Sequence, residues 1–183
     1  MRFRPTIFFL TVAAWAMLGA GARGGRGEDS AALEQQVKSA FVVNFLQFTD
    51  WPAGAFEKAD DPIVIGVLDA KSLGDTLAAA IQGKSVKGRK LEIRTVTADT
   101  IGNCRVLIVG GTEGADLQKA LKATGAGPIL TIGDSEHFTA EGGIIRFYVE
   151  DRKERFEINQ AAAQRAQLQI SSKLLKLAKV VNK

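Results

Sequence analysis

The sequence predicts an α/β sandwich, in which helices flank a mixed central sheet. Apolar runs typical of buried strands alternate with helical segments through the middle of the chain. Two alternating strands separated by a short turn follow nearer the C-terminus, as in a hairpin. The composition, 46% hydrophobic and 24% charged, is that of an ordinary globular domain. Because alternating strands and helices favour parallel pairing and a hairpin is antiparallel, the expected sheet is mixed.

The first 22 residues are typical of a secretory signal peptide. Arg2 and Arg4 precede an apolar run over residues 6–18, and small residues follow up to Ala22. We expect cleavage after Ala22. An uncleaved membrane anchor is the alternative, but the run is short against the roughly 20 residues that a bilayer span needs. Removing this segment takes two arginines from the formal charge of +4, so charge is no argument for nucleic-acid binding.

Residues 23–34 are expected to form a flexible lead and the start of the first helix, and the domain to occupy residues 35–181. The helix should run from about Ser30 to Phe48, where apolar residues recur at spacings of three and four. Trp51-Pro52 follows it, and proline disfavours helix at the preceding residue. Asn44 interrupts the apolar stripe. We expect its amide to be buried and hydrogen-bonded, with a place at an interface as the alternative.

The middle of the chain is expected to supply four strands and two helices. These segments are apolar runs, alternating runs, or helical patterns that follow a capping position. In chain order they are a strand at 62–68, a helix at 72–82, strands at 91–97 and 105–109, a helix at 115–123 and a strand at 129–132. A basic turn is expected at 83–90, and a single helical turn at 135–140.

The last part of the chain is expected to form a hairpin and two helices. Gly142-Gly143 opens the hairpin, whose strands alternate over 145–149 and 156–158. Asn159 is expected to cap a helix over 160–165. Ser171 or Ser172 is expected to cap a final helix over 173–181.

The residues that carry chemistry exclude several classes of site. Cys104 is the single cysteine and His137 the single histidine, so neither an internal disulfide nor a structural zinc site can form. Residues 134–137 contain the letters of a hydrolase triad, but neighbours in sequence seldom converge on one reacting atom. The loop at 110–114 matches no phosphate-binding motif, and we expect a plain turn. We therefore expect no catalytic residue, no metal and no cofactor, and a protein that is not an enzyme.

Three features remain as candidates for binding. The basic cluster at 84–90 is expected to be a solvated turn, with a contact to anionic lipid or an acidic partner as the alternative and no role in nucleic-acid binding. Gln169, Ser171 and Lys173 are candidate contacts for a small anionic ligand, with simple helix capping as the alternative. Cys104 is expected to be a buried, inert thiol, with an intermolecular disulfide as the alternative.

Several stretches taken together resemble one family, the YfiR-like periplasmic proteins. The first is VKSAFVVNFLQFTDWP, and the most specific contains RFEIN followed by LQISSKLLKLA. The resemblance spans almost the whole mature chain, in matching order and spacing. The stretches lie at residues 37–52, 83–94, 103–108, 129–145 and 155–178.

The resemblance implies an α/β sandwich that forms a homodimer in the periplasm. It implies a regulator that binds the periplasmic part of an inner-membrane diguanylate cyclase and represses it, lowering cyclic-di-GMP and biofilm formation. It also implies an outer-membrane-associated partner that can sequester the regulator. Members can carry two disulfides. Cys104 matches one of their cysteine positions but has no partner here, so control through an internal disulfide does not transfer.

The first helix is apolar on nearly every side, which suits a protein that docks on another protein. If they are not buried internally, Val42, Phe45, Leu46 and Trp51 are therefore the expected partner or dimer interface. The alternative function is a periplasmic small-ligand-binding module that serves a membrane sensor or an uptake receptor, with the segment from Gln169 to Lys173 as its anion contact.

Overall fold

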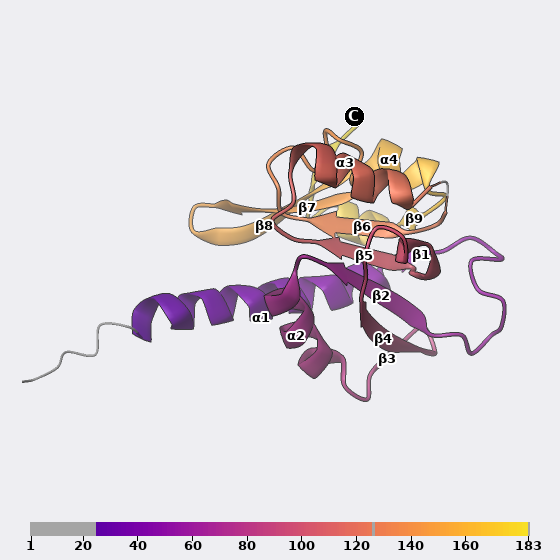
Figure 1. The fold of residues 1–183 in the computed structure, drawn as a ribbon, viewed down its shortest axis with the longest axis horizontal. Coiled ribbons are helices and arrows are strands. Elements are labelled where there is room, and N and C mark those ends of the chain that lie inside the picture. Colours follow the sequence, from indigo (N-terminus) through magenta and orange to yellow (C-terminus); the bar gives the residue numbers. More distant parts are fainter. Residues whose placement is uncertain (1–24, 126, 183) are drawn as a thin grey trace, which may run out of the picture.

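The computed structural model describes residues 25–125 and 127–182, so the predicted signal peptide lies outside the described residues. The described chain forms an eight-stranded sheet, a small two-stranded sheet and helices on both faces of the large sheet (Figure 1). The helical elements are α1 Gly25–Gln47, α2 Lys71–Ile81, the 3-10 turn η1 Ile101–Asn103, α3 Gly114–Ala123, α4 Gln160–Arg165 and α5 Ser172–Leu175. The strands are β1 Thr49–Asp50, β2 Ile63–Leu68, β3 Ser85–Val86, β4 Arg89–Thr95, β5 Val106–Val109, β6 Leu130–Gly133, β7 Ile145–Glu150, β8 Lys153–Asn159, β9 Gln169–Ile170 and β10 Lys179–Val181.

The large sheet has the order β10-β8-β7-β6-β5-β2-β4-β3. The strands at its centre are parallel. β2 runs parallel to β4 and to β5, and β6 runs parallel to β5 and to β7. β7 and β8 form an antiparallel hairpin, and β3 lies antiparallel on β4. The α/β fold with a mixed sheet that the sequence predicts is confirmed.

The chain reverses its direction across the sheet at β2. It passes through α2 to β4 on one side of β2, whereas β5 lies on the other side and leads through α3 to β6. Leu77 of α2 packs in the core face that α1 covers, and Leu117 of α3 packs in the opposite face. This reversal leaves a crevice at the carboxyl ends of β2 and β5, which is where open α/β sheets hold their ligands.

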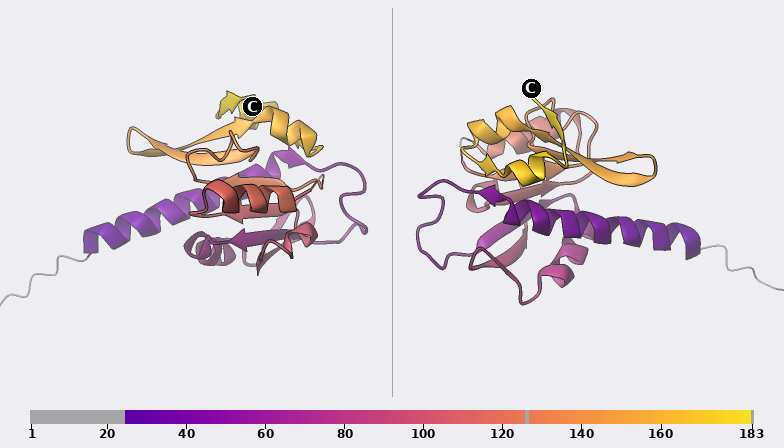
Figure 2. Two further views of the ribbon diagram at one scale, coloured as in Figure 1. Left: turned by 45° about the horizontal axis from the view of Figure 1, so that its top comes forward. Right: turned by 180° about the vertical axis from the view of Figure 1, so that it is seen from behind.

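Helix α1 begins at Gly25, earlier than the predicted Ser30, and its N-terminal half projects from the body. Figures 1 and 2 show the β7–β8 hairpin projecting on the same side of the molecule. Asn44 is exposed, so the prediction of a buried amide is wrong. Asn44 lies on the outer side of α1, while Phe45 and Leu46 next to it turn inward. No helix in the described part of the chain has the length and apolarity to span a bilayer.

The predicted final helix over 173–181 is wrong. Only α5 is helical, and the chain then turns to form β10, which runs parallel to β8 with Val181 opposite Asn159. The apolar spacing of this segment favours helix, but β8 offers an open row of backbone hydrogen-bonding groups that the segment completes. Tertiary pairing has outweighed local propensity here.

Two further local predictions need correction. The basic turn at 83–90 contains a hairpin, β3–β4, and its two turn residues Lys87 and Gly88 both have positive φ. The segment at 135–140 is a series of turns rather than a helix, with the Phe138 ring seated against Gly133 and Gly143. A Cβ at either glycine would lie within 2.5 Å of that ring, so the ring requires glycine at both positions.

Candidate functional site

The inner side of α1 forms part of the core. Val42, Phe45 and Leu46 have no exposed surface, and the Phe45 ring lies 4.9 Å from Phe156 and 5.6 Å from Phe147. The sequence-based expectation of an interface at these three residues depended on their being exposed. They pack within one chain instead, because the sheet needs an apolar helix to cover its hairpin strands.

Trp51 is the one member of that predicted set which keeps some exposed surface. Its indole Nε1 donates to the Arg105 carbonyl at 3.3 Å, and its ring lies 6.3 Å from Phe56. Arg89 stacks over Phe56 at 3.8 Å from the ring centroid. Trp51 therefore lies in an aromatic and cationic surface cluster, where contact with a partner remains a proposal.

Two of the basic residues at 84–90 stabilise the fold. Lys87 donates to the Thr49 carbonyl and pairs with Asp50. Arg89 donates to the Lys58 and Asp61 carbonyls. Two of the basic side chains in this cluster thus hold neighbouring loops in place through hydrogen bonds and an ion pair.

Exposed apolar side chains mark the projecting part of the molecule. Leu33 on α1 is 60% exposed, and Val149 near the tip of the β7–β8 hairpin is 63% exposed. Leu177 and Val180, at the β10 edge of the sheet, are also exposed. Single exposed apolar side chains are common on protein surfaces, so a docking role for these four residues is a proposal.

One lysine and three carboxylates lie between α1 and the hairpin. Lys38 is 8% exposed at its side chain, and its Nζ lies 2.7 Å from Glu34 and 3.3 Å from Asp134. Burial alone would lower the pKa of Lys38, but the Glu34 hydrogen bond and the Asp134 charge outweigh it, so the pKa is raised. Burial raises the pKa of Glu154, which lies near the same group, and one of its carboxylate oxygens is buried without a partner among the described residues.

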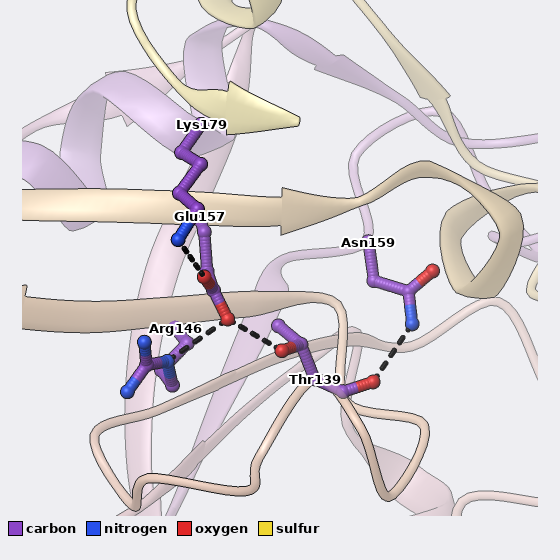
Figure 3. A network of polar contacts seen from close by, with 5 residues as sticks. All are labelled: Thr139, Arg146, Glu157, Asn159 and Lys179. Atoms are coloured by element: carbon purple, nitrogen blue, oxygen red, sulfur yellow. Dashed lines mark hydrogen bonds and ion pairs between the residues drawn. The ribbon is translucent and has the colours of Figure 1, made fainter. Parts of the chain in front are cut away.

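A second polar network crosses the outer face of β7, β8 and β10 (Figure 3). Glu157 is 5% exposed at its side chain and accepts from Arg146 Nε at 2.9 Å and from the Thr139 hydroxyl at 2.5 Å. Lys179 on β10 lies 3.9 Å from the other Glu157 oxygen. Asn159 donates to the Thr139 carbonyl and caps α4 through Ala162, which confirms the predicted cap. The network joins three strands and the 135–140 turn.

The predicted ligand contacts lie on one short surface segment. Gln169 pairs with Asp50 in the two-stranded sheet, and Ser171 donates its backbone N–H to Phe48. The Ser171 hydroxyl accepts from the Lys173 N–H at 3.3 Å and so caps α5. The three residues are brought together, and the capping role is the one the structure displays. A ligand role for them stays a prediction.

The single cysteine and histidine lie in different surroundings. Cys104 is buried and free, and burial raises its pKa although Arg94 and Arg105 act against that rise. This fits the predicted buried thiol. His137 is exposed in the turn after β6.

Sequence reasoning missed the two polar networks. The alternation of strands places Arg146 and Glu157 on the outer face of the hairpin, and a correct register would have made them cross-strand partners. The Glu34–Lys38 pair has the i,i+4 spacing of a helix and could have been predicted, whereas the contact of Lys38 with Asp134 could not, because Asp134 lies 96 residues away along the chain.

Comparison with known proteins supports the family resemblance. A family model described as YfiR/HmsC-like matches residues 35–179. No curated protein matches the chain. A solved structure, a conserved domain protein from Vibrio cholerae O1 biovar eltor, is similar with a TM-score of 0.57 and 13% identity, over 80% of this chain. This chain covers 59% of that protein's length, and the likeness shows a shared fold.

The family match extends from the middle of α1 to the first residue of β10, so it includes the hairpin, the Glu157 network, and Lys38 with Asp134. The family is regulatory rather than catalytic, and its members work in the periplasm. The chain belongs to the YfiR/HmsC-like family.

Proposed function

We propose that this protein binds the periplasmic part of an inner-membrane diguanylate cyclase and represses it. Membership of the YfiR/HmsC-like family is the observation that carries the proposal. Repression by binding requires a docking surface on the regulator but no catalysis by it. Binding would lower the activity of the cyclase, and the cyclic-di-GMP level and biofilm formation would fall as a result.

The proposed docking surface is the projecting half of α1 together with the tip of the β7–β8 hairpin. Leu33 and Val149 supply exposed apolar side chains there, in place of the core residues first expected to do so. Glu34 and Asp134, each more than 40% exposed, lie between α1 and the body and add negative charge. A partner with apolar residues beside basic ones fits this surface.

The experiment is a binding measurement between the purified mature protein and the periplasmic domain of the cyclase encoded nearest to it. We expect Leu33→Asp or Val149→Asp to weaken binding by at least about 10-fold. Ala79→Asp, a matched change on exposed helix surface away from the projection, should leave it unchanged. Equal weakening by all three variants would show that the proposed surface is not the contact.

The proposal includes a homodimer and an outer-membrane-associated protein that sequesters the regulator. The exposed Leu177 and Val180 at the β10 edge support self-association, since open sheet edges with apolar side chains favour pairing. Light scattering of the wild type and of Val180→Asp tests the dimer. A dimeric wild type and a monomeric, folded variant are expected, and a monomeric wild type would contradict the dimer.

A further inference from the structure

The large sheet ends at β4 and the short β3, beside α2 (Figure 1). β3 pairs with β4 only at Arg89 and Lys90. From Leu91 to Thr95, β4 pairs with β2 on its inner edge. Over residues 91–95, roughly 16 Å of strand, no strand of the described chain pairs with its outer edge. We call the outer side of residues 91–95 the open edge.

The backbone groups that face outward on the open edge follow from the hydrogen bonds around it. Val96 donates its N–H to the Val67 carbonyl at the end of β2. Successive residues of a strand direct their N–H and C=O groups to alternate sides, so those of Leu91, Ile93 and Thr95 face outward. These groups have no backbone partner in the described part of the chain. They are therefore free to pair with an added strand.

A groove of about 650 Å³ lies between β4 and the last turn of α2. Ala78 and Ile81 of α2 and Leu91 and Ile93 of β4 supply its apolar lining. Leu91 and Ile93 pack against the core but are only partly buried. The volume falls within the roughly 300–1,000 Å³ of clefts that hold ligands. Side chains of an added strand that point to this face would meet an apolar surface.

The groove also carries positive charge. Lys84 and Lys90 line it, and no aspartate or glutamate does so among the described residues. The other two basic residues of the 84–90 cluster are bonded to neighbouring loops, whereas the ammonium groups of Lys84 and Lys90 have no ion pair in the described chain. Because strand faces alternate, Lys90 lies on the face of β4 opposite to Leu91. An added strand would meet apolar side chains on one face and a cation on the other.

These features together define what fits the open edge. Backbone pairing supplies affinity in strand addition, and pockets for alternate side chains supply specificity. Apolar residues suit the α2 face, and acidic residues between them suit Lys84 and Lys90. A second copy of this chain is a poorer fit, because its own β4 carries Arg89, Lys90 and Arg94 against one carboxylate and would add positive charge to a basic groove.

We propose that the open edge of β4 and the groove beside α2 bind an extended segment of a partner protein, in which apolar and acidic residues alternate. The segment would lie where β3 would continue if it were longer. This surface is at the opposite edge of the sheet from β10 and apart from the β7–β8 hairpin, so its role is separate from docking on the cyclase.

Nuclear magnetic resonance of the isotope-labelled mature protein tests the proposal, with a capped hexapeptide that alternates valine and glutamate as the probe. We expect saturable binding that slows hydrogen exchange of the Leu91, Ile93 and Thr95 amides at least about 10-fold. Two control peptides should bind at least about 10-fold more weakly, one with lysine in place of glutamate and one with every backbone nitrogen methylated.

Three results would overturn the proposal. They are no binding of the valine–glutamate peptide, no slowing of exchange at these three amides, and equally tight binding of either control peptide. In each case Lys84 and Lys90 would be charges that only guard an exposed edge against pairing.

Variants of the groove locate the contact. Ala78→Trp fills the groove and should weaken binding at least about 10-fold, whereas Ala79→Trp makes the same change at the next exposed position, outside the groove, and should bind as the wild type does. The double variant Lys84→Glu with Lys90→Glu should prefer the valine–lysine peptide, and Lys119→Glu on α3 should keep the wild-type preference.

Unchanged binding by the folded Ala78→Trp variant, or an unchanged peptide preference in the folded double variant, would contradict this site. Because no cyclase is present in the assay, its result is separate from the test of repression.

Discussion

Arg146 and Glu157 face each other across the β7–β8 hairpin, and Arg146 Nε donates to Glu157 Oε1 at 2.9 Å. Glu157 is nearly fully buried, and its second oxygen lies 3.9 Å from Lys179 on the last strand. Figure 3 shows that the contacts of Glu157 come from separate parts of the chain. This carboxylate therefore ties the hairpin to β10 and to the 135–140 turn.

Arg146→Met should lower the free energy of unfolding more than Glu157→Gln does. Arg146→Met leaves a buried carboxylate without its main partner, and we expect a loss of about 3 kcal/mol in the free energy of unfolding. Glu157→Gln keeps a hydrogen-bonding side chain and should cost about 1–2 kcal/mol. Urea unfolding of both variants checks the order. A smaller loss for Arg146→Met than for Glu157→Gln would contradict it.

The pH dependence of stability should distinguish the two glutamates of β8. Burial would raise the pKa of Glu157, but its bonds to Arg146 and Thr139 outweigh burial, so its folded pKa lies below the ordinary value. Its contribution to stability is then present above the unfolded pKa of about 4.3 and is lost as the pH falls through the folded pKa. The stability gap between the wild type and Glu157→Gln should therefore shrink from pH 7 towards pH 3.

Glu154 is the matched control on the same strand. Burial raises its folded pKa, with Glu34 and Asp134 adding to the rise against Lys38. Its ionised form opposes folding, so Glu154→Gln should raise Tm at pH 7 and lose that advantage in acid. Thermal unfolding of both Gln variants across this pH range is the measurement. A gap that widens in acid for Glu157→Gln would contradict the assigned direction.

Gly66 and Cys104 should be coupled in stability. A Cβ at Gly66 would lie 2.7 Å from the Cys104 sulfur, so Gly66→Ala overpacks the core and should cost about 1–3 kcal/mol. Cys104→Ala removes the sulfur, and the double variant should lose less than the sum of the two single losses. Gly102→Ala, where a Cβ meets nothing within 4 Å, is the control. Additive losses in urea unfolding would show that the contact is not the cause.

The thiol of Cys104 should be unreactive in the folded protein. It is buried, and burial raises its pKa, so little of the nucleophilic thiolate forms at neutral pH. We expect slow labelling by a thiol reagent in buffer and rapid labelling in denaturant. Rapid labelling of the folded chain, or a disulfide-linked dimer on a non-reducing gel, would instead favour the intermolecular disulfide.

Variants of α1 should separate folding from partner binding. Phe45→Ala opens a cavity in the core and should cost about 3–5 kcal/mol. Leu33→Asp changes an exposed side chain and should alter stability by less than about 0.5 kcal/mol. Circular dichroism melts of both variants, read beside the binding measurement, check this division. A large loss of stability in Leu33→Asp would place Leu33 in the folded core of an assembly.

The regular elements of the fold could be predicted from the sequence because each carries its own pattern. The apolar run of β2 and the Asn159 cap are local signals, and both are found where expected. The strand β10 could not be predicted, since the pairing that makes residues 179–181 a strand comes from β8. The same local pattern of apolar spacing favours helix there.

The candidate site was less accessible to sequence reasoning. The apolar character of α1 was visible, but whether Phe45 faces a partner or the sheet depends on where the hairpin packs. Lys38 and Asp134 are distant in sequence and meet only because α1 crosses the carboxyl end of β6. The reversal of strand order at β2, which leaves the crevice at the carboxyl ends of β2 and β5, is a property of the whole sheet, and no single segment encodes it.

The most direct test of the proposed function is the cyclic-di-GMP level in a strain that lacks this protein and keeps its neighbouring membrane cyclase. The account predicts a rise in cyclic-di-GMP and in biofilm on deletion. Both should be restored to wild-type levels by the wild-type gene and by Ala79→Asp but not by Leu33→Asp. An unchanged cyclic-di-GMP level in the deletion strain, with the cyclase shown to be active, would contradict repression.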